Sequence, residues 1–562
     1  MVQADLVIYN ANILTLDEQS TRAGSLASYK GKITGVWTVQ QPPEDGLIKS
    51  DNFKEIDLNG ATLIPGFIDT HNHILMYGQQ KHQVDCRSPF NKNIKDIQQR
   101  LAEAAQQKNE NEWIIGYGYD DSLLEEMRHP TKKDLDAINT KHPIFIRHIS
   151  GHLAVTNSAG LQIAGITKDT PQPEGGHIEK DSLGEPTGVL FEPGAMNLVF
   201  SHVPLPDKEE LIQILKEELI QILKEVNNDY LAEGITTNTD AGIGLFNGEE
   251  ELDIYLQAIK ENPRSMKMRL MILNELLIDN GPFHTYTATE LDNEIQERTN
   301  GKARLDSAKI FQDGSIQGLT GALRKPYHCD NHLYGDLIYK QEIINEFALD
   351  FHQRGFRIAT HGNGDRAIGS IIEAYEYALK NGEQRDHRHR IEHVQTATEK
   401  DLEKMSELDI AASFFINHVY YWGDRHRDIF LGPDRAKRLN PLKEADHLNI
   451  LYTLHSDCPI TPISPLFSVW AAVNRVTSSG EVLGAGQKID VETALKTMTT
   501  YGARLNFEEN EKGTIEVGKT ADFAILEEDP TLINPMKIKD INVLATYIDG
   551  QLVFEKESLK VN

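Results

Sequence analysis

The chain has 562 residues, of which 39% are hydrophobic and 25% are charged, a balance that is typical of a globular protein with a large core. Its formal net charge of −28 excludes a nucleic-acid-binding role, because phosphate backbones require a basic surface, and it disfavours an anionic membrane surface. The length allows one (β/α)8 barrel, which commonly takes about 250 residues, together with one or two smaller modules.

The sequence predicts neither a secretory signal nor a membrane span. The first residues lack a basic segment followed by an apolar run, and no apolar stretch reaches the ~20 residues that a transmembrane helix needs. The three cysteines, Cys86, Cys329 and Cys458, include no CxxC pair, so we expect no disulfide framework. Together these features predict a cytoplasmic protein.

Short apolar runs separated by Asn, Asp and Gly occupy both ends of the chain and are typical of strands. The N-terminal runs are 6–9, 13–16, 25–29 and 33–38, and the C-terminal runs are 513–517, 522–526, 543–548 and 552–554. The last two runs are joined by Asp549-Gly550, which is a strong hairpin signal. We therefore predict one small β-sandwich domain assembled from residues 1–60 and 505–562.

The middle of the chain alternates short apolar runs with helical stretches, which predicts an α/β fold with a parallel sheet. The candidate strands are 63–69, 235–239, 268–273, 308–313, 356–360, 390–393, 410–414 and 450–454. A helix is predicted at 366–379, where the apolar residues follow one face. Eight strands with helices between them predict a TIM (β/α)8 barrel formed by residues 61–80 and 234–504.

Residues 81–233 are too many for a barrel loop, so we predict an α/β insertion domain after the first barrel strand that covers the active site. This segment contains strand-like runs at 113–116 and 144–148. Its last helix repeats the sequence ELIQILKE at 210–217 and 218–225, and helical amphipathicity explains the repeat without a function.

Histidines and one aspartate follow several predicted barrel strands. His71 and His73 close the first strand, and side chains two apart on a strand face the same side. His361 and His393 end the fifth and sixth strands, and the eighth strand runs into His455-Ser456-Asp457. Barrel enzymes keep their active sites at the C-terminal ends of the strands, and imidazole with carboxylate suits Zn²⁺ or a similar ion. Each residue alone could be structural, but together they favour a metal site.

The ordered motifs resemble the amidohydrolase superfamily, in particular its family 3 branch, which contains N-substituted formamide deformylase. The segments that carry the resemblance are PGFIDTHNH at 65–73, GITT at 234–237, KIFQDGS at 309–315, HGNGD at 361–365, EHVQ at 392–395, SD at 456–457 and GTIEVGKTADF at 513–523. They span nearly the whole chain.

The resemblance implies a binuclear metal centre, with two Zn²⁺ expected and Fe²⁺ or Mn²⁺ as alternatives. The implied ligands are His71, His73 and Asp457 for one metal and His361 and His393 for the other, with carboxylated Lys309 as the bridge. Asp457 would also be the catalytic general base for a metal-bridging hydroxide that attacks an amide carbon. A simple ion pair between Lys309 and an acid such as Asp313 stays open as the alternative. Homodimers are common in the family, so the resemblance implies a homodimer.

Three further residues are candidates for contact with the substrate. His152, in SGHLAVTNS at 150–158, is expected to bind a substrate carbonyl or to stabilise the oxyanion as a second catalytic group. Asp120, in GYGYD at 116–120, and Trp422, in YYW at 420–422, are expected to contact substrate in the pocket. A purely structural role stays open for each of them.

We therefore expect a metal-dependent amidohydrolase that hydrolyses the C–N bond of a small-molecule amide, in particular an N-formyl or N-acyl amine. A cyclic amidohydrolase or a mononuclear deaminase on the same fold is the alternative, and the number of bound metals separates these activities, because a single-metal deaminase does not need Lys309. A non-catalytic barrel scaffold is disfavoured because every expected ligand position is filled.

Overall fold

The computed structural model describes residues 1–81, 83–88, 90–109, 111–138, 141–173, 175–203, 209–245 and 248–556. The chain divides into two compact units, which are described separately. Unit 1 consists of Met1–Ile74, Leu223–Asp313 and Gly321–Asn562, and unit 2 consists of Leu75–Ile222 and Gly314–Thr320. Within the described residues, no helix combines the length and the apolar character that crossing a bilayer requires.

The centre of unit 1 is a parallel sheet that curls into a nearly closed barrel. Its order follows the chain: β8 (Phe67–Asn72), β15 (Ile235–Ile243), β16 (Lys267–Leu273), β17 (Ala303–Phe311), β18 (Ile358–Gly362), β19 (Arg390–His393), β20 (Ala411–Phe414) and β21 (Tyr452–Leu454). The first strand, β8, contacts the last, β21. This arrangement confirms the predicted TIM barrel.

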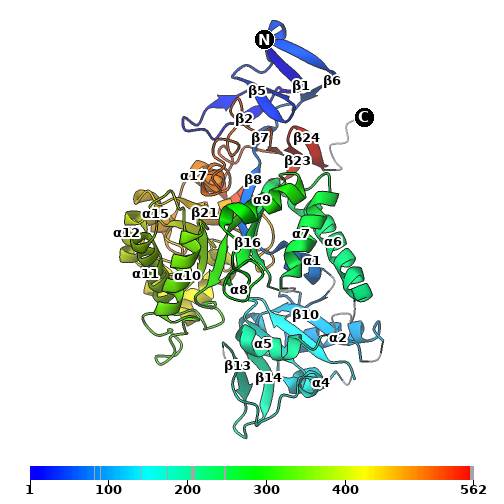
Figure 1. The fold of residues 1–562 in the computed structure, drawn as a ribbon, viewed down its shortest axis with the longest axis vertical. Helices are drawn as coiled ribbons and strands as arrows, with labels where there is room; N and C mark the ends of the chain where they lie inside the picture. The colour runs from blue at the N-terminus through cyan, green and yellow to red at the C-terminus, as the bar shows by residue number, and fades with distance from the viewer. Residues whose placement is uncertain are drawn as a thin grey trace. The chain divides into compact units, whose positions relative to one another are not determined.

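Helices between the strands surround the barrel (Figure 1). The longer ones are α7 (Glu250–Glu261), α9 (Ala288–Thr299), α10 (Gln341–Gln353), α11 (Asp365–Asn381), α12 (Glu399–Glu407) and α16 (Pro465–Asn474). The shorter ones are α8 (Asn274–Leu277), α13 (His418–Arg425), α14 (Pro433–Ala436), α15 (Leu442–His447), α17 (Val491–Thr497) and α18 (Thr500–Leu505). Helix α11 confirms the helix predicted at 366–379, and it buries Ile368, Ile371 and Tyr375 on one face.

The first predicted barrel strand, 63–69, is wrong in its extent because Pro65-Gly66 divides it. The part before the division is β7 (Thr62–Pro65), which pairs with β2 (Asn12–Leu14) and β22 (Phe523–Leu526) in another sheet. Glycine suits the junction, because a Cβ at Gly66 would lie 2.3 Å from the Thr236 side chain. The barrel strand β8 therefore begins only at Phe67.

Two sheets from both ends of the chain form a β-sandwich in unit 1 (Figure 1). One has the order β5 (Lys32–Trp37), β4 (Ser25–Tyr29), β1 (Val2–Tyr9), β6 (Leu47–Asp57), and the other β24 (Gln551–Glu555), β23 (Val543–Ile548), β22, β7, β2, β3 (Arg22–Ala23). Ile8, Ile13 and Phe523 share its buried core. This confirms the predicted sandwich from both termini.

Near the C-terminus the predicted hairpin is present, but the strand predicted at 513–517 is not. Asp549 and Gly550 join β23 to β24 with φ of 50° and 70°, as a type I′ turn requires, so the predicted hairpin is confirmed. The strand predicted at 513–517 is wrong. Gly513 and Gly518 each have a φ of 94°, and these left-handed residues turn the chain at both ends of the segment.

Unit 2 contains one mixed sheet with helices on both faces. Its order is β13 (His177–Lys180), β14 (Pro186–Phe191), β12 (Leu153–Thr156), β11 (Ile144–His148), β10 (Ile114–Tyr119) and β9 (Val84–Asp85). Its helices are α2 (Ile94–Ala105), α3 (Lys132–Asp136), α4 (Ser158–Ile163) and α5 (Glu192–Phe200). One core lies with α2 and α3 and the other with α4 and α5, on opposite faces of the sheet.

The strands predicted at 113–116 and 144–148 correspond to β10 and β11. Helix α1 (Ile74–Gln80) begins at the end of unit 1, and α6 (Glu209–Ala232), which carries the ELIQILKE repeat, runs from unit 2 into unit 1. The domain boundaries at 81–233 and the covering of the active site by this segment stay predictions.

Candidate metal centre

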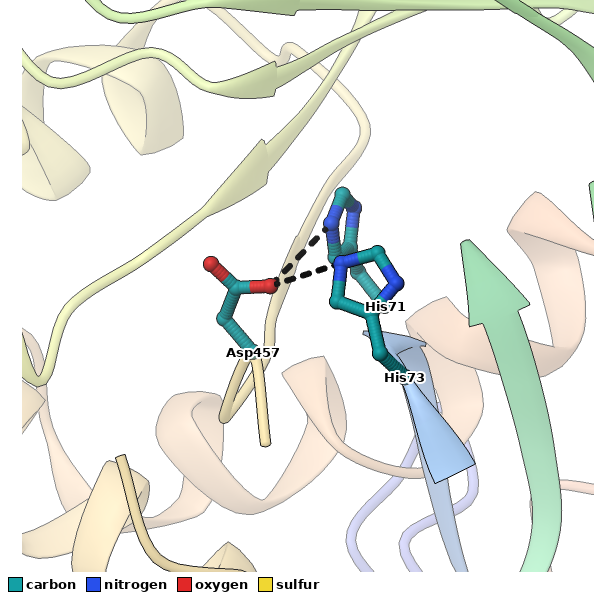
Figure 2. A group of neighbouring side chains, drawn as sticks. All are labelled: His71, His73 and Asp457. Atoms are coloured by element: carbon teal, nitrogen blue, oxygen red, sulfur yellow. Dashed lines mark ion pairs between the residues drawn. The ribbon is translucent and has the colours of Figure 1, made fainter. Parts of the chain in front are cut away.

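The two histidines at the end of the first barrel strand face one carboxylate. Asp457 Oδ1 lies 3.3 Å from His71 Nε2 and 3.4 Å from His73 Nε2, and all three side chains are buried (Figure 2). The donor atoms of a tetrahedral zinc site, with bonds of about 2.0–2.1 Å, lie roughly 3.3–3.4 Å from one another. The spacing of the three atoms therefore fits a divalent cation between them.

Unpaired polar atoms near these residues favour the same interpretation. Among the described residues, the buried atoms without a hydrogen bond include His73 Nδ1, Lys309 Nζ, His393 Nδ1, Asp457 Oδ1 and both ring nitrogens of His455. The imidazoles of His71, His393 and His455 pack together, with ring centroids 4.7–5.1 Å apart. Burying polar groups without partners costs free energy, and a bound cation would compensate for this cost.

A buried carboxylate that the sequence analysis did not single out orients His71. Glu392 Oε2 lies 2.5 Å from His71 Nδ1, and Glu392 Oε1 accepts a hydrogen bond of 2.5 Å from Arg390 Nε. Although burial raises it, the pKa of Glu392 is held well below its usual value by the charges of Arg390 and His71. An ionised Glu392 accepts a hydrogen bond from His71 Nδ1–H and so orients the ring with Nε2 facing Asp457. The sequence signal was present: Arg390 and Glu392 are charged residues two apart on a short barrel strand whose four residues are all buried.

The histidines of the fifth and sixth barrel strands also come together. His393 Nε2 lies 3.0 Å from His361 Nδ1, so two ring nitrogens face one another inside the barrel. On its other side, His361 Nε2 lies 3.7 Å from Asp313 Oδ1. Asn363 Nδ2 lies 2.9 Å from the same nitrogen, so a hydrogen bond on this side of the ring fixes the orientation of His361.

Lys309 is fully buried on the fourth barrel strand, β17. Burial lowers the pKa of Lys309 to about 8. Its Nζ forms no hydrogen bond with any of the described residues and lies 4.9 Å from the centre of the Phe311 ring. Asp313 instead accepts hydrogen bonds from the backbone N–H groups of Ala322, Asn363 and Gly364. The structure thus contains no hydrogen bond between Lys309 and Asp313.

The loop that carries Asp457 is tied to the first strand by Asp69, another residue that the sequence analysis did not single out. Asp69 Oδ1 accepts a hydrogen bond of 3.2 Å from His71 N, and Oδ2 accepts one of 2.7 Å from Ser456 Oγ.

Although burial raises it, the pKa of Asp457 is held well below its usual value by the side chains of His71 and His73. Asp457 is therefore ionised at neutral pH and can accept a proton.

A chain of ring contacts links Trp422 to the histidines of this centre. It is buried on α13, and its ring centroid lies 4.6 Å from that of His418. His418 packs on Phe415, which in turn packs on His455, with ring centroids 4.5 Å and 5.0 Å apart. Trp422 therefore belongs to an aromatic layer behind the candidate ligands.

The other two predicted substrate contacts, His152 and Asp120, lie in unit 2. His152 Nδ1 lies 2.8 Å from Glu192 Oε2. Asp120 Oδ1 accepts hydrogen bonds of 3.0 Å and 2.5 Å from the backbone and side chain of Ser122, so it also fixes a turn. The contacts of His152 and Asp120 with a substrate stay predictions.

Comparisons with known proteins agree with an amidohydrolase. The model of the amidohydrolase family matches residues 54–554. The chain is 28% identical to N-substituted formamide deformylase of Arthrobacter pascens, over 98% of each chain. It is 29% identical to the protein LONG AFTER FAR-RED 3 of Arabidopsis thaliana, over 98% of this chain and 92% of that protein. A solved structure of an uncharacterized metal-dependent hydrolase from Pyrococcus horikoshii has a TM-score of 0.70 at 23% identity and covers 94% of this chain and 99% of its own.

Proposed function

Since the chain belongs to the amidohydrolase family and is a hydrolase of carbon–nitrogen bonds other than peptide bonds, we propose that it hydrolyses an N-formyl or N-acyl amine. The proposed centre holds two divalent cations, with Zn²⁺ as the expected metal and Fe²⁺ or Mn²⁺ as alternatives. The observation that carries the proposal is the convergence of His71 Nε2 and His73 Nε2 on one oxygen of Asp457, at 3.3 Å and 3.4 Å.

The proposed ligands follow the geometry of the barrel mouth. The first set is His71, His73 and Asp457, the second is His361 and His393, and carboxylated Lys309 is shared between them. When bound, divalent cations polarise a substrate carbonyl and make water acidic enough to supply a nucleophile at neutral pH. The side chains of the protein hold the metal-ligating atoms in place and transfer the proton from water to the leaving amine.

Asp457 is suited to the proton transfers because it is ionised and its carboxylate faces the two histidines that end the first barrel strand. In the proposed reaction it accepts a proton from the attacking water, and the carbon–oxygen bond forms as the carbonyl carbon becomes tetrahedral. The carbon–nitrogen bond then breaks, and Asp457 returns the proton to the leaving amine. The products are a carboxylic acid, which is formic acid for a formamide, and an amine.

Lys309 is suited to carboxylation because its burial favours the uncharged amine. The neutral Nζ attacks carbon dioxide, a nitrogen–carbon bond forms, and one proton leaves to solvent. The resulting carbamate is an anionic oxygen donor, whereas an ammonium at this position would repel a cation. In the described part of the chain no group forms a hydrogen bond with Lys309 Nζ, which supports this role.

The substrate class rests on the relative that is named for deformylation of N-substituted formamides, at 28% identity. We further propose a small-molecule substrate, a cytoplasmic location and a homodimer, with Trp422, His152 and Asp120 as substrate contacts. We also propose that residues 81–233 form a separate insertion domain.

The test combines elemental analysis of protein purified without chelators with a hydrolysis assay on matched N-formyl and N-acetyl amines. We expect the wild type to hold two metals more than a chain in which His71, His73, His361 and His393 are replaced by alanine, and to turn over the N-formyl series in a way that chelation abolishes and added metal restores. A difference of one metal would favour a mononuclear deaminase. No metal after addition of Zn²⁺ or Mn²⁺, or no hydrolysis of either series by metal-loaded protein, would contradict the proposal.

A further inference from the structure

A second group of metal-ligating side chains lies in unit 2. Asp120, Asp121 and His148 each offer a donor atom within 4.8 Å of the other two. His148 Nε2 lies 3.1 Å from Asp121 Oδ1, and His129 Nδ1 lies 3.5 Å from the same oxygen. We propose that this group binds one divalent transition-metal cation, with Zn²⁺ as the reference ion, independently of the barrel centre.

The topology of the unit 2 sheet creates this cluster. Strands β10 and β11 are parallel neighbours in which Tyr119 pairs with His148, so their carboxyl ends coincide. Asp120 and Asp121 directly follow β10, and His148 ends β11. Ligands of parallel sheets bind outside the carboxyl ends of the strands, because side chains from neighbouring strands converge there. His129 joins the group from the segment before α3.

The cluster combines donor types that transition metals prefer. Two carboxylates and one or two imidazoles form a mixed nitrogen and oxygen set, which suits Zn²⁺ and similar ions. Although burial raises it, the pKa of Asp121 is held below its usual value by His148, so the carboxylate is ionised. Burial lowers the pKa of His129, which keeps its ring neutral and able to ligate. Within the described part of the chain, only imidazoles form ion pairs with Asp121, and no lysine or arginine does.

The surroundings of His148 match those of a ligating histidine. Its Nδ1 lies 2.8 Å from Ser150 Oγ, which can accept a proton from this nitrogen when Nε2 ligates a metal. Without a metal, the Ser150 N–H faces Nδ1 at 3.1 Å, and the Nε2 proton points to Asp121. Ligation through Nε2 therefore requires the ring proton to lie on Nδ1, where Ser150 Oγ accepts it and the Ser150 N–H gives up this acceptor. The buried Tyr119 ring packs 5.1 Å from the ring of His148 and limits water on that side.

The first experiment counts Zn²⁺ in the full chain after chelator treatment, Zn²⁺ addition and gel filtration. The variants are Asp121→Asn and His148→Gln, and the matched control is Asp169→Asn, which changes an exposed aspartate of the same unit. We expect each of the two variants to retain one Zn²⁺ fewer per chain than the wild type and the control. Equal Zn²⁺ content in all four proteins would overturn the proposal and leave adventitious surface binding only.

The second experiment removes the barrel centre and does not depend on the folding of the Asp121 or His148 variants. In a chain in which His71, His73, His361 and His393 are all replaced by alanine and which is stripped of metal, added Zn²⁺ should still raise the midpoint of thermal unfolding, because the unit 2 site remains. Co²⁺ should give a ligand-field absorption band in this protein. The absence of both effects would refute the unit 2 site. Failure of the proposed function would instead leave both effects intact and remove hydrolysis alone.

Discussion

At the scale of single residues, the candidate metal centre concentrates strain and unpaired groups. His393 and Asp457 have φ of 71° and 50°, in the left-handed region that side chains other than glycine rarely adopt. Such conformations cost on the order of 1–3 kcal/mol each and persist where the surrounding structure imposes them, often at functional sites. Lys309 adds a fully buried amine that has no hydrogen-bond partner among the residues that the structure describes. These costs are consistent with residues selected for ligation and proton transfer rather than for stability.

Replacing Asp457 with asparagine tests the proton-transfer role. The amide cannot accept the proton, so we expect kcat on an N-formyl amine to fall on the order of 10³-fold, because general acid–base groups contribute 10²–10⁴-fold. The fold should be retained, as measured by circular dichroism. A variant that keeps more than a tenth of wild-type kcat would contradict the role.

Replacing Lys309 with alanine tests the bridging role. Without the carbamate, we expect the metal content to fall, and added acetate or propionate should partly restore both metal content and turnover, because a carboxylate can occupy the space of the missing oxygen donor. Elemental analysis with and without these acids is the measurement. Undiminished metal content in Lys309→Ala would remove this lysine from the centre.

At the scale of elements, the junction between α10 and β19 contains three buried histidines that have no part in the metal centre. Ile358 N–H donates to His389 Nδ1, so His389 Nε2–H donates to His352 Nδ1, at 2.9 Å. His352 Nε2 then donates to the Glu383 carbonyl, and His387 accepts from the backbone N–H of His389. Each ring is therefore held neutral in one tautomer, and burial lowers the pKa of all three histidines.

This junction predicts a loss of stability in acid. Because the pKa of His389 is lowered on folding, the unfolded chain binds its proton first, and stability is lost as pH falls below the unfolded value of about 6.5. At pH 5.5 the expected cost from His389 is about 1.4 kcal/mol. Urea unfolding at pH 7.5 and 5.5 should show a smaller pH dependence in His389→Gln than in wild type. The control His332→Gln changes an exposed histidine and should leave the dependence unchanged; an unaltered dependence in His389→Gln would refute the assignment.

At the scale of the whole molecule, the β-sandwich of unit 1 joins segments from opposite ends of the chain. β22 pairs with β7, and the Phe523 ring stacks on Tyr547 at 4.8 Å in a core that also contains Ile8 and Ile13. The same β7 leads through Pro65-Gly66 directly into the barrel strand that carries His71. The packing of the C-terminal strands therefore affects β7 and, through it, the barrel strand that positions His71.

Replacing Phe523 with alanine should destabilise the sheet in which the C-terminal strand β22 pairs with β7. This sheet also contains β2 and β3 from the N-terminal part of the chain. The expected loss is about 3–5 kcal/mol in the free energy of unfolding, from lost burial and the remaining cavity. Hydrogen exchange should accelerate in β2 and β7 more than in β17. Leu532→Ala is the control, since Leu532 is 74% exposed, and a loss equal to that of Phe523→Ala would contradict the argument.

The sequence alone determined the features that depend on local pattern and chain order. Alternating apolar runs and helical stretches predicted the eight barrel strands, and Asp549-Gly550 predicted the final hairpin, because turn and strand preferences act over a few neighbours. The spacing of His71 and His73 also predicted that both face one side. The resemblance to a family supplied Lys309 and the assignment of ligands to two metals.

Only the tertiary structure decided which distant groups meet. It divided 63–69 between two sheets at Pro65-Gly66, because backbone pairing there depends on β22 and β15, which lie far away in the chain. It brought Glu392 to His71 across the barrel and linked Asp69 to Ser456. Contacts of this kind depend on how strands close into a barrel, and no local preference of the chain encodes that closure.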